Sequence, residues 1–203
     1  MLRYLYEKRL MRQISPYPVP SCVAIVISSG DLDGAGLDNL REVIGWMGPL
    51  GVKSLLIYIA EDRPELEAAL MRGLAEIPAR IHIHRRRGKV LKSDGLGMDV
   101  IISLGYGGKQ EVTEAITNIL VKVERGLIEP QEIDEKMIEA NLRFRFKPDL
   151  VIRAGGRQLS DFMIWQAAYS ELYFTEVNWN SIRRIDLLRA IRDYQARERR
   201  YGR

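Results

Sequence analysis

Two arginines and a serine surround a pair of glycines directly after the apolar residues 150–152; the three are Arg153, Arg157 and Ser160. The order predicts a strand, a loop large enough for an anion, and a helix over residues 162–169. Glycine lets backbone N–H groups approach a ligand closely, arginine offers a fork of donors, and a helix N-terminus attracts negative charge. The pattern indicates a phosphate or diphosphate site, although a tight turn with solvated arginines would look the same.

Composition bounds the class of protein but not its function. The chain has 203 residues, 46% hydrophobic and 29% charged, which is typical of one soluble α/β domain. Its net charge of +4 and pI near 9.2 fit anionic ligands, nucleic acid, an anionic membrane surface or simple solubility equally well. The single cysteine, Cys22, leaves neither an internal disulfide nor a cysteine cluster for zinc, which favours a reducing compartment. We expect a cytoplasmic protein, soluble or peripheral to a membrane, because no apolar run approaches bilayer-spanning length.

Strand and helix patterns alternate along the chain. Strands are predicted at residues 23–27, 54–59, 80–84, 100–104, 150–152 and 173–177, and helices at 38–47, 65–74, 111–123, 130–140, 162–169 and from 181 onward. Such alternation predicts an α/β fold with a mostly parallel central sheet flanked by helices, and a site at the carboxyl ends of the strands. No repeat or linker divides the chain. We therefore expect one domain over residues 1–203, with an N-terminal arm at 1–20 and a tail at 197–203.

The N-terminal arm has leucines, tyrosines and basic residues at helical spacing over residues 1–13. Such a helix could pack on the domain, on a partner protein or on an anionic membrane. Packing on the domain is the favoured interpretation.

The strongest basic run is Arg85, Arg86, Arg87 and Lys89. It could contact nucleic acid or lipid headgroups, but a solvated hairpin tip is the favoured interpretation, and we expect no nucleic acid partner. His82 and His84 alternate with isoleucines, so both are expected on one exposed strand face. With no carboxylate close in sequence, they make a poor metal site.

The residues around the predicted anion site carry a wider resemblance. Pro148-Asp-Leu-Val-Ile-Arg153, Leu159-Ser-Asp-Phe162 and Trp165-Gln-Ala-Ala-Tyr-Ser-Glu171 resemble the signature of the cis-prenyltransferases, the undecaprenyl and dehydrodolichyl diphosphate synthases. Further matches follow in the family's order over nearly the whole chain, among them Tyr106-Gly-Gly108. The resemblance implies an α/β fold around a parallel sheet, a dimer, and head-to-tail addition of isopentenyl diphosphate to an allylic diphosphate with cis geometry.

The allylic half of the family's site is where this chain departs. The family has Asp-Gly-Asn-Gly-Arg-Trp after its first strand, and its aspartate holds magnesium; this chain has Ser28-Ser29-Gly30-Asp31. A serine hydroxyl does not supply the anionic oxygen that Mg²⁺ favours. The loop that brings the family's arginines and a histidine to the allylic diphosphate is missing before Ala35. We therefore assign no catalytic residue, and expect Mg²⁺ in the active complex but not held by this chain alone.

The isopentenyl diphosphate half is better kept. Arg153 and Ser160 match residues that hold this substrate in the family, and Arg157 stands near the place of a second arginine. Glu171 matches a carboxylate near the magnesium and is offered as a metal ligand on that basis. The tail contains the family's Arg-X-Gly motif as Arg200 and Gly202, which the resemblance implies reaches across the dimer to the neighbouring subunit's isopentenyl diphosphate.

This selective loss resembles the non-catalytic subunits of heteromeric cis-prenyltransferases, of the Nogo-B receptor type. The leading hypothesis is a partner subunit that completes the active site of a catalytic chain making long-chain polyprenyl diphosphate. One alternative is a self-sufficient homodimeric synthase in which Asp31 or Asp33 replaces the missing aspartate. Another is a non-enzymatic module that binds an anionic ligand through the basic run at residues 85–87.

Overall fold

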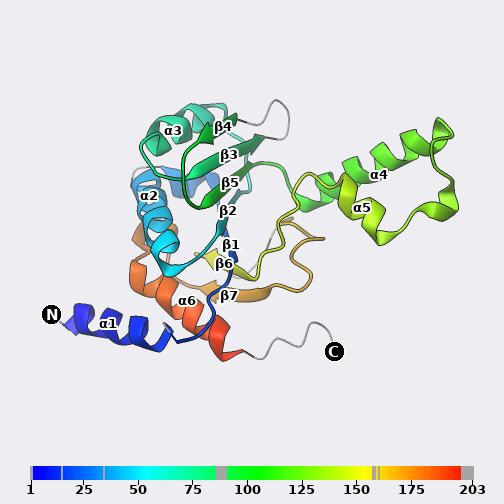
Figure 1. Cartoon of the computed structure of the whole chain (residues 1–203). Coiled ribbons are helices and arrows are strands. Elements are labelled where there is room, and N and C mark those ends of the chain that lie inside the picture. Colours follow the sequence, from blue (N-terminus) through cyan, green and yellow to red (C-terminus); the bar gives the residue numbers. More distant parts are fainter. Residues whose placement is uncertain are drawn as a thin grey trace.

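A computed structural model describes residues 2–14, 16–33, 35–85, 91–156, 159 and 161–197 of the chain. Its centre is a seven-stranded sheet with the order β4–β3–β5–β2–β1–β6–β7 (Figure 1). The strands are β1 (Cys22–Ile27), β2 (Ser54–Ile59), β3 (Arg80–Arg85), β4 (Leu91–Asp94), β5 (Asp99–Leu104), β6 (Leu150–Ala154) and β7 (Glu171–Thr175). Each pairing is parallel except that of β4 with β3. The predicted α/β fold with a mostly parallel sheet is confirmed.

β1 lies in the middle of the sheet because both of its faces are apolar. All six of its residues are buried, and it pairs with β2 on one side and β6 on the other. Val23, Ile25 and Ile27 join the core of one face, whereas Ala24 and Val26 join that of the other. Burial on both faces is typical of a central parallel strand. It places the residue that follows β1 at the middle of the carboxyl edge of the sheet.

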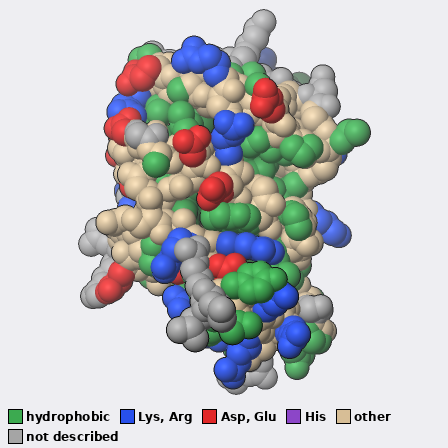
Figure 2. Space-filling view, turned by 90° about the vertical axis from the view of Figure 1, so that its left-hand side faces the viewer, with side chains coloured by type: hydrophobic (Ala, Val, Ile, Leu, Met, Phe, Trp, Pro, Cys, Tyr) green, Lys and Arg blue, Asp and Glu red, His purple; other side chains and the backbone are tan. Residues whose placement is uncertain are grey.

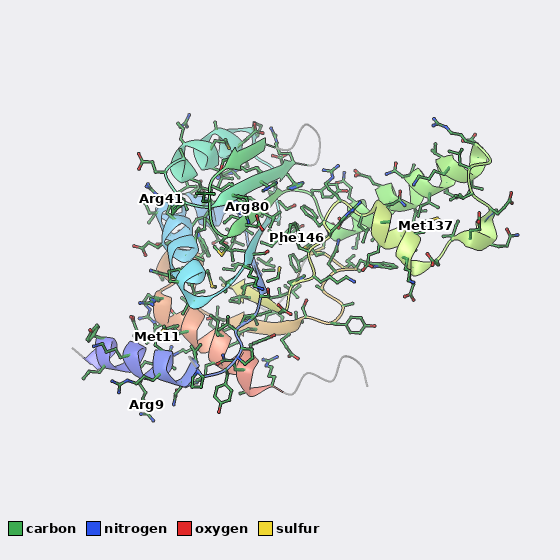
Figure 3. All side chains as sticks on the ribbon, in the orientation of Figure 1. Arg9, Met11, Arg41, Arg80, Met137 and Phe146 are labelled. Atoms are coloured by element: carbon green, nitrogen blue, oxygen red, sulfur yellow. The ribbon has the colours of Figure 1, made fainter. Side chains whose placement is uncertain are left out.

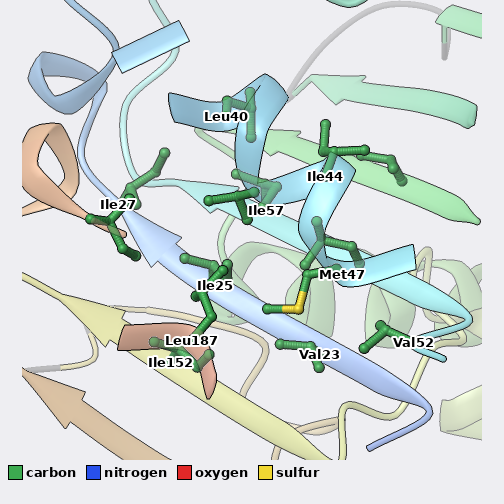
Figure 4. Packing of buried hydrophobic residues seen from close by; sticks show 14 of the residues in the cluster. Val23, Ile25, Ile27, Leu40, Ile44, Met47, Val52, Ile57, Ile152 and Leu187 are labelled. Carbon is green, nitrogen blue, oxygen red and sulfur yellow. The ribbon is translucent and has the colours of Figure 1, made fainter. Parts of the chain in front are cut away.

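Four helices cover one face of the sheet: α1 (Leu2–Ile14), α2 (Gly36–Met47), α3 (Pro64–Leu74) and α6 (Arg184–Ala196). Figure 4 shows Leu40, Ile44 and Met47 of α2 packed over β1 and β2. These side chains recur every three or four residues, so one side of the helix is apolar and faces the sheet. α1 adds Leu10 and Ile14 to the same core, as expected for an arm that packs on the domain.

The opposite face is covered mainly by loops. The helices on this side, α4 (Gly108–Glu124) and α5 (Glu135–Asn141), extend together away from the sheet (Figure 1). A smaller core joins Tyr58 of β2 to Tyr106, Phe144 and Phe162 from loops. The rings of Tyr58 and Phe162 meet edge to face, with centroids 5.5 Å apart. Aromatic packing thus holds the loop after β6 against the sheet.

The helix predicted over residues 162–169 is not formed; its described residues make turns with one helical hydrogen bond, from Ala167 N–H to Met163 O at 3.0 Å. Asp161 and Met163 have positive φ angles of 47° and 24°, which a helix does not allow. Phe162 and Met163 are pulled into the smaller core, and this burial outweighs the helical spacing. The segment after the predicted anion loop therefore has no helix N-terminus to offer.

Other element boundaries moved for local reasons. The helix predicted over residues 130–140 is split into a 3-10 turn, Pro130–Glu132, and α5, because Asp134 caps α5 by accepting from Met137 N–H at 2.8 Å. The last strand lies two residues earlier than predicted, at Glu171–Thr175. The helix predicted from residue 181 begins at Arg184, after the 3-10 turn Trp179–Ser181.

Candidate functional site

The carboxyl ends of β5, β2, β1 and β6 lie side by side at one edge of the sheet. The residues that directly follow these strands are Gly105, Ala60, Ser28 and Gly155. Ligands of open α/β sheets bind outside this edge. The structure therefore brings Ser28 and Arg153, from distant parts of the sequence, to neighbouring strand ends, with Arg153 opposite Val26 in the β1–β6 register.

At the end of β1, the nearby carboxylates serve as acceptors for the chain itself. Ser28 donates from both its N–H and its Oγ to Oδ2 of Asp31, each at 2.8 Å. The N–H of Ser29 donates to Oε2 of Glu61 at 2.7 Å. These bonds fix the 3-10 turn Ser29–Leu32 that follows β1. Asp31 and Glu61 thus both lie at this strand end, but each has a structural partner.

The cation nearest to this end is also neutralised. Arg63 donates to Asp33 at 2.6 Å and to the carbonyl oxygen of Ser29 at 3.1 Å. The hydrogen bond from Arg63 lowers the pKa of Asp33 below its ordinary value. With its guanidinium shared between these two partners, Arg63 offers little positive charge to a diphosphate. The charges at the end of β1 and β2 are therefore matched within the chain, although the buried Nε of Arg63 has no hydrogen-bond partner among the described residues.

Arg153, on β6, differs from Arg63 because no carboxylate of the described residues forms an ion pair with it. Its Nη1 donates to the carbonyl oxygen of Val26 at 2.9 Å, which holds the side chain across the β1–β6 junction. Its Nε is buried and, like that of Arg63, has no hydrogen-bond partner among the described residues. A buried donor without an acceptor costs free energy, so this position favours an anion or a polar ligand that would accept from it.

The glycines after β6 leave room beside this arginine. A Cβ on Gly156 would lie 3.2 Å from both Nε and Nη2 of Arg153, and Gly155 has a φ of +67°. A hollow of about 450 Å³ opens next to them, lined also by Phe174, Thr175 and Glu176. Strand, glycine pair, arginine and hollow together fit the phosphate-binding loop that the sequence predicts.

The loop after β5 already holds a side chain of the same chain, that of Asp161. The N–H groups of Gly108 and Lys109 donate to the backbone and side-chain oxygens of Asp161, at 2.6 and 2.8 Å. A Cβ on Gly107 would lie only 2.1 Å from the Asp161 carboxylate, so this position requires glycine. The sequence reasoning missed the role of Asp161. Glycines at the start of a helix indicate a bound anion, and here that anion is the carboxylate of Asp161 in the same chain.

Tyr106, of the Tyr-Gly-Gly motif, is structural. Its ring lies in the smaller core and under the guanidinium of Arg143, 3.9 Å from centroid to Cζ. Its hydroxyl donates to Glu114 at 2.7 Å, and burial raises its pKa. A tyrosine anchored in this way ties the first turns of α4 to the smaller core.

Glu171 lies at the amino ends of the strands, whereas Ser28 lies at their carboxyl ends. It is the first residue of β7, and because β7 is parallel to β6 its start faces the amino ends of the strands. Its carboxylate accepts from Arg197 at 3.0 Å. Within this chain Glu171 is therefore not grouped with Ser28 and Arg153. Its metal role stays a prediction that the geometry of one subunit does not support.

Arg157, Ser160, Arg200 and Gly202 lie outside the described residues, and their binding roles remain predictions. Of the basic run, residues 86–90 are likewise outside. Arg85 is described, and it pairs with Asp62 at 3.0 Å and with Glu67 at 2.9 Å. Since its charge is matched by two carboxylates, it does not favour nucleic acid binding.

The two histidines are not on an exposed face as predicted. His82 and His84 are both partly buried, because loop residues cover this side of β3. The His84 ring packs at 4.9 Å, centroid to centroid, from Phe144. Packing of this kind is a structural role.

The donor set of this chain does not fit the magnesium that the family resemblance implies. In the described part of the chain, no group of three or more His, Cys, Asp or Glu side chains could hold a metal ion. The strand end that would carry the metal has a neutral Ser28, and its carboxylates, Asp31 and Glu61, accept backbone hydrogen bonds. Mg²⁺ prefers carboxylate oxygens with room for several waters.

Comparison with known sequences places this geometry in a family. A family model described as "Putative undecaprenyl diphosphate synthase" matches residues 73–202. The chain is 33% identical to a tritrans,polycis-undecaprenyl-diphosphate synthase (geranylgeranyl-diphosphate specific) of Methanocaldococcus jannaschii, over 98% of this chain and 88% of the relative. It is 31% identical to an isoprenyl transferase of Thermus thermophilus, over 100% of this chain and 96% of the relative. These alignments run over 247 and 252 residues, more than the 203 of this chain, so the relatives carry segments that it lacks.

Solved structures agree in fold. The lavandulyl diphosphate synthase from Lavandula x intermedia, in complex with dimethylallyl diphosphate, has a TM-score of 0.74 and 28% identity, covering 91% of this chain and 99% of that one. A probable undecaprenyl diphosphate synthase from Campylobacter jejuni has a TM-score of 0.72 at 20% identity, covering 92% and 100%, and so supports the fold alone. From the family match, the relatives and the shared fold, the chain belongs to the undecaprenyl diphosphate synthase family of cis-prenyltransferases.

Proposed function

We propose that this chain is a subunit of a heteromeric cis-prenyltransferase, in which it binds isopentenyl diphosphate but does not activate the allylic diphosphate. The observation that carries the proposal is the end of β1. Ser28 stands where the family resemblance places the metal-binding aspartate, and the nearest carboxylate, Asp31, accepts two hydrogen bonds from Ser28 itself. This resembles the non-catalytic subunits of the Nogo-B receptor type.

The part of the site that this chain would supply is the loop after β6. Arg153 has an unpartnered Nε beside a glycine-lined hollow, which suits a diphosphate that accepts several charged hydrogen bonds. We further propose that the tail, with Arg200 and Gly202, extends the catalytic subunit's isopentenyl diphosphate site. The catalytic subunit would supply the Mg²⁺-binding carboxylate and the groups around the allylic diphosphate.

The surface that would receive the catalytic subunit is the β7 edge of the sheet. Leu172 and Phe174 on β7 are 36% and 44% exposed, and Ile164 and Tyr169 in the preceding turns are 51% and 68% exposed. An edge strand with apolar side chains invites pairing with another protein. In this proposal residues 1–203 form one cis-prenyltransferase-like domain in the cytoplasm, with the arm at 1–20 and the tail at 197–203 as appendages.

A self-sufficient homodimeric polyprenyl diphosphate synthase is the second candidate, and two observations favour it. The relatives named above are described as synthases and transferases rather than as accessory subunits. Asp31 also lies at the end of β1, within hydrogen-bond distance of Ser28. In this reading, Asp31 would leave Ser28 and take the place of the missing aspartate.

One experiment separates the two candidates: transfer of labelled isopentenyl diphosphate to an allylic diphosphate with Mg²⁺. The purified chain is assayed alone, and then mixed with a cis-prenyltransferase homologue from the same source that retains the aspartate. Activity of the mixture above that of the homologue alone, with none from this chain alone, is the result expected for a partner subunit.

A matched pair of variants sharpens the assay. Asp31→Ala should leave the mixture active if this chain is a partner subunit, and should abolish the activity of this chain alone if it is self-sufficient. Turnover by the unaided wild-type chain that is lost in Asp31→Ala would overturn the partner-subunit proposal.

A further inference from the structure

α1 has two faces with different roles. Leu10 and Ile14 are buried in the main core, and Arg184 of α6 approaches the sulfur of Met11 at 3.9 Å. Figure 3 shows Met11 on the side of α1 nearest to α6 and Arg9 on its outer side. One side of the helix is thus fixed to the domain, while the other is presented to solvent.

The outer side of α1 combines positive charge with exposed apolar groups. Tyr4, Lys8 and Arg12 form one row at four-residue spacing, and Leu5, Arg9 and Gln13 form the row beside it. All six side chains are exposed. Glu7 is the only acidic residue among residues 2–14, and it is half-buried. Side chains four apart share a helix face, so every charged side chain of the exposed face is basic.

Lys8, Arg9 and Arg12 form no ion pair with a described carboxylate. Lys8 instead lies over the ring of Tyr4, 4.6 Å from its centroid. This differs from Arg63, Arg85 and Arg197, each of which is paired with two acids. A basic face without acidic partners carries a positive electrostatic potential, which repels cations and attracts an anionic surface.

The basic face continues onto α6. A hollow of about 640 Å³ lies between the end of α1 and α6, with Arg12 on one wall and Arg192 on the other. Tyr17, 64% exposed, stands at its edge. Gln195 fixes the floor by donating to the carbonyl oxygens of Ile14, Tyr17 and Pro18 at 3.1 to 3.2 Å. Figure 2 shows Lys and Arg side chains gathered on the lower part of this face, around α1.

We propose that the basic face of α1, continued by Arg192 of α6, docks this chain on an anionic lipid bilayer. Lys8, Arg9, Arg12 and Arg192 contact the headgroups, Tyr4, Leu5 and Tyr17 enter the interface, and the headgroup phosphate fits between Arg12 and Arg192. Among the described residues, no helix is long and apolar enough to cross a bilayer, so the contact is peripheral. Charge complementarity favours a membrane as the partner. The basic side chains of the helix suit the anionic headgroups, and its exposed aromatic and aliphatic side chains suit the hydrocarbon beneath them. The inference does not depend on the proposed function.

The test is co-sedimentation of the full chain with vesicles, either of phosphatidylcholine alone or of equal parts phosphatidylcholine and phosphatidylglycerol. We expect binding to the anionic vesicles only, weakened by salt because exposed charges are screened over about 10 Å at 0.1 M ionic strength. The triple reversal Lys8→Glu, Arg9→Glu and Arg12→Glu should reduce the partition coefficient at least about tenfold, since each cation near an anionic surface contributes appreciably.

The matched control carries the same change of charge at exposed cations elsewhere: Lys53→Glu, Arg72→Glu and Arg125→Glu. It should bind as the wild type does, within about twofold. Thermal melting of both triple variants checks that each is folded. Equal loss in the two would mean a non-specific net-charge effect, and binding to neutral vesicles, or to double-stranded RNA as tightly as to anionic vesicles, would overturn the proposal. Tyr4→Ser with Leu5→Ser should remove the part of the binding that resists salt.

Discussion

The two halves of the sheet's carboxyl edge have the same architecture and opposite chemistry. At the end of β1 and β2, each described charge close to the backbone has a partner within the chain: Asp31 with Ser28, Glu61 with Ser29, and Arg63 with Asp33. At the end of β6, Arg153 has no ion-pair partner among the described residues, and it lies next to glycines and a hollow. A buried Nε without a described hydrogen-bond partner is common to Arg153 and Arg63. The difference teaches that a site is recognised by a charge that the chain leaves unmatched and by the room beside it, and not by the number of charged residues it contains.

We call the end of β6 the open half and the end of β1 and β2 the closed half. The largest expected effect is at the open half. Arg153→Ala should lower kcat/KM for isopentenyl diphosphate in the active complex roughly a hundredfold, because charged hydrogen bonds contribute about 1.5–3 kcal/mol each. Steady-state kinetics against isopentenyl diphosphate measures this. The matched control is Arg63→Ala in the closed half, which should change kcat/KM about twofold or less. Equal losses from the two variants would erase the distinction between the halves.

A deletion tests the part of the open half that the tail is proposed to supply. Removing residues 201–203 should reduce turnover by the complex by about tenfold or more, because it removes Gly202, whose backbone is proposed to donate a hydrogen bond to the charged diphosphate. The melting temperature of this chain alone should stay unchanged, because the domain core lies elsewhere. Full turnover by the truncated complex would remove the tail from the site.

In the closed half, the expected effect is on stability. Asp31→Ala should lower the free energy of unfolding by about 1 kcal/mol, because it removes the acceptor for the N–H and the hydroxyl of Ser28. Asp31→Asn keeps an acceptor oxygen and should lose less than half as much. Urea unfolding compares the two variants with the wild type. A loss of isopentenyl transfer in Asp31→Asn without a loss of stability would show that the half is catalytic after all.

The smallest expected effect concerns the hydrogen bonds that tie α4 to the segment before β6 and to the turns after it. Glu111, 2% exposed, accepts from Phe144 N–H at 2.6 Å and from Gln166 at 2.9 Å, and burial raises its pKa above the ordinary 4.5. A carboxyl with a raised pKa binds its proton more tightly in the folded chain. Its contribution to stability is therefore full below pH 4.5 and is lost as pH rises through the folded pKa.

Glu111→Gln should remove this loss, so that the variant's stability falls less steeply than the wild type's as pH rises above 4.5. Gln166 has an unpartnered Oε1 that could accept from the new amide after a flip of its side chain. Unfolding free energies at several pH values measure the difference. Parallel profiles for the two proteins would mean that Glu111 does not titrate in this range.

The sequence was a good guide to the sheet and to the helices that cover it. The strand predicted at residues 54–59 is found at Ser54–Ile59, and α2 and α3 begin within two residues of the predicted positions. Continuous apolar runs and three-to-four-residue spacing are local signals, and here the tertiary packing agrees with them. The segment at residues 162–169 failed because its apolar residues satisfy the core as turns, which periodicity alone does not reveal.

The site was predicted in part. The resemblance pointed to Arg153 and Ser28, and the parallel register explains why they lie at neighbouring strand ends. The partners of Asp31, Glu61 and Asp161 were out of reach, because each bond depends on how a loop folds back on a strand end. Glu171 shows the converse difficulty. A motif match does not reveal whether a residue lies at the amino or the carboxyl ends of the strands, and this decides which residues are close together within one subunit.

The bond between Ser28 and Asp31 also bears on how such a chain could evolve. A single reversion, Ser28→Asp, would set a second carboxylate against Oδ2 of Asp31, where the serine hydroxyl now lies at 2.8 Å. Two carboxylates so close repel each other. An aspartate at position 28 would therefore be compatible with this turn only if the side chain of Asp31 moved away or was also replaced. The bond that stabilises this strand end thus makes a metal-binding aspartate here a change of two residues rather than one.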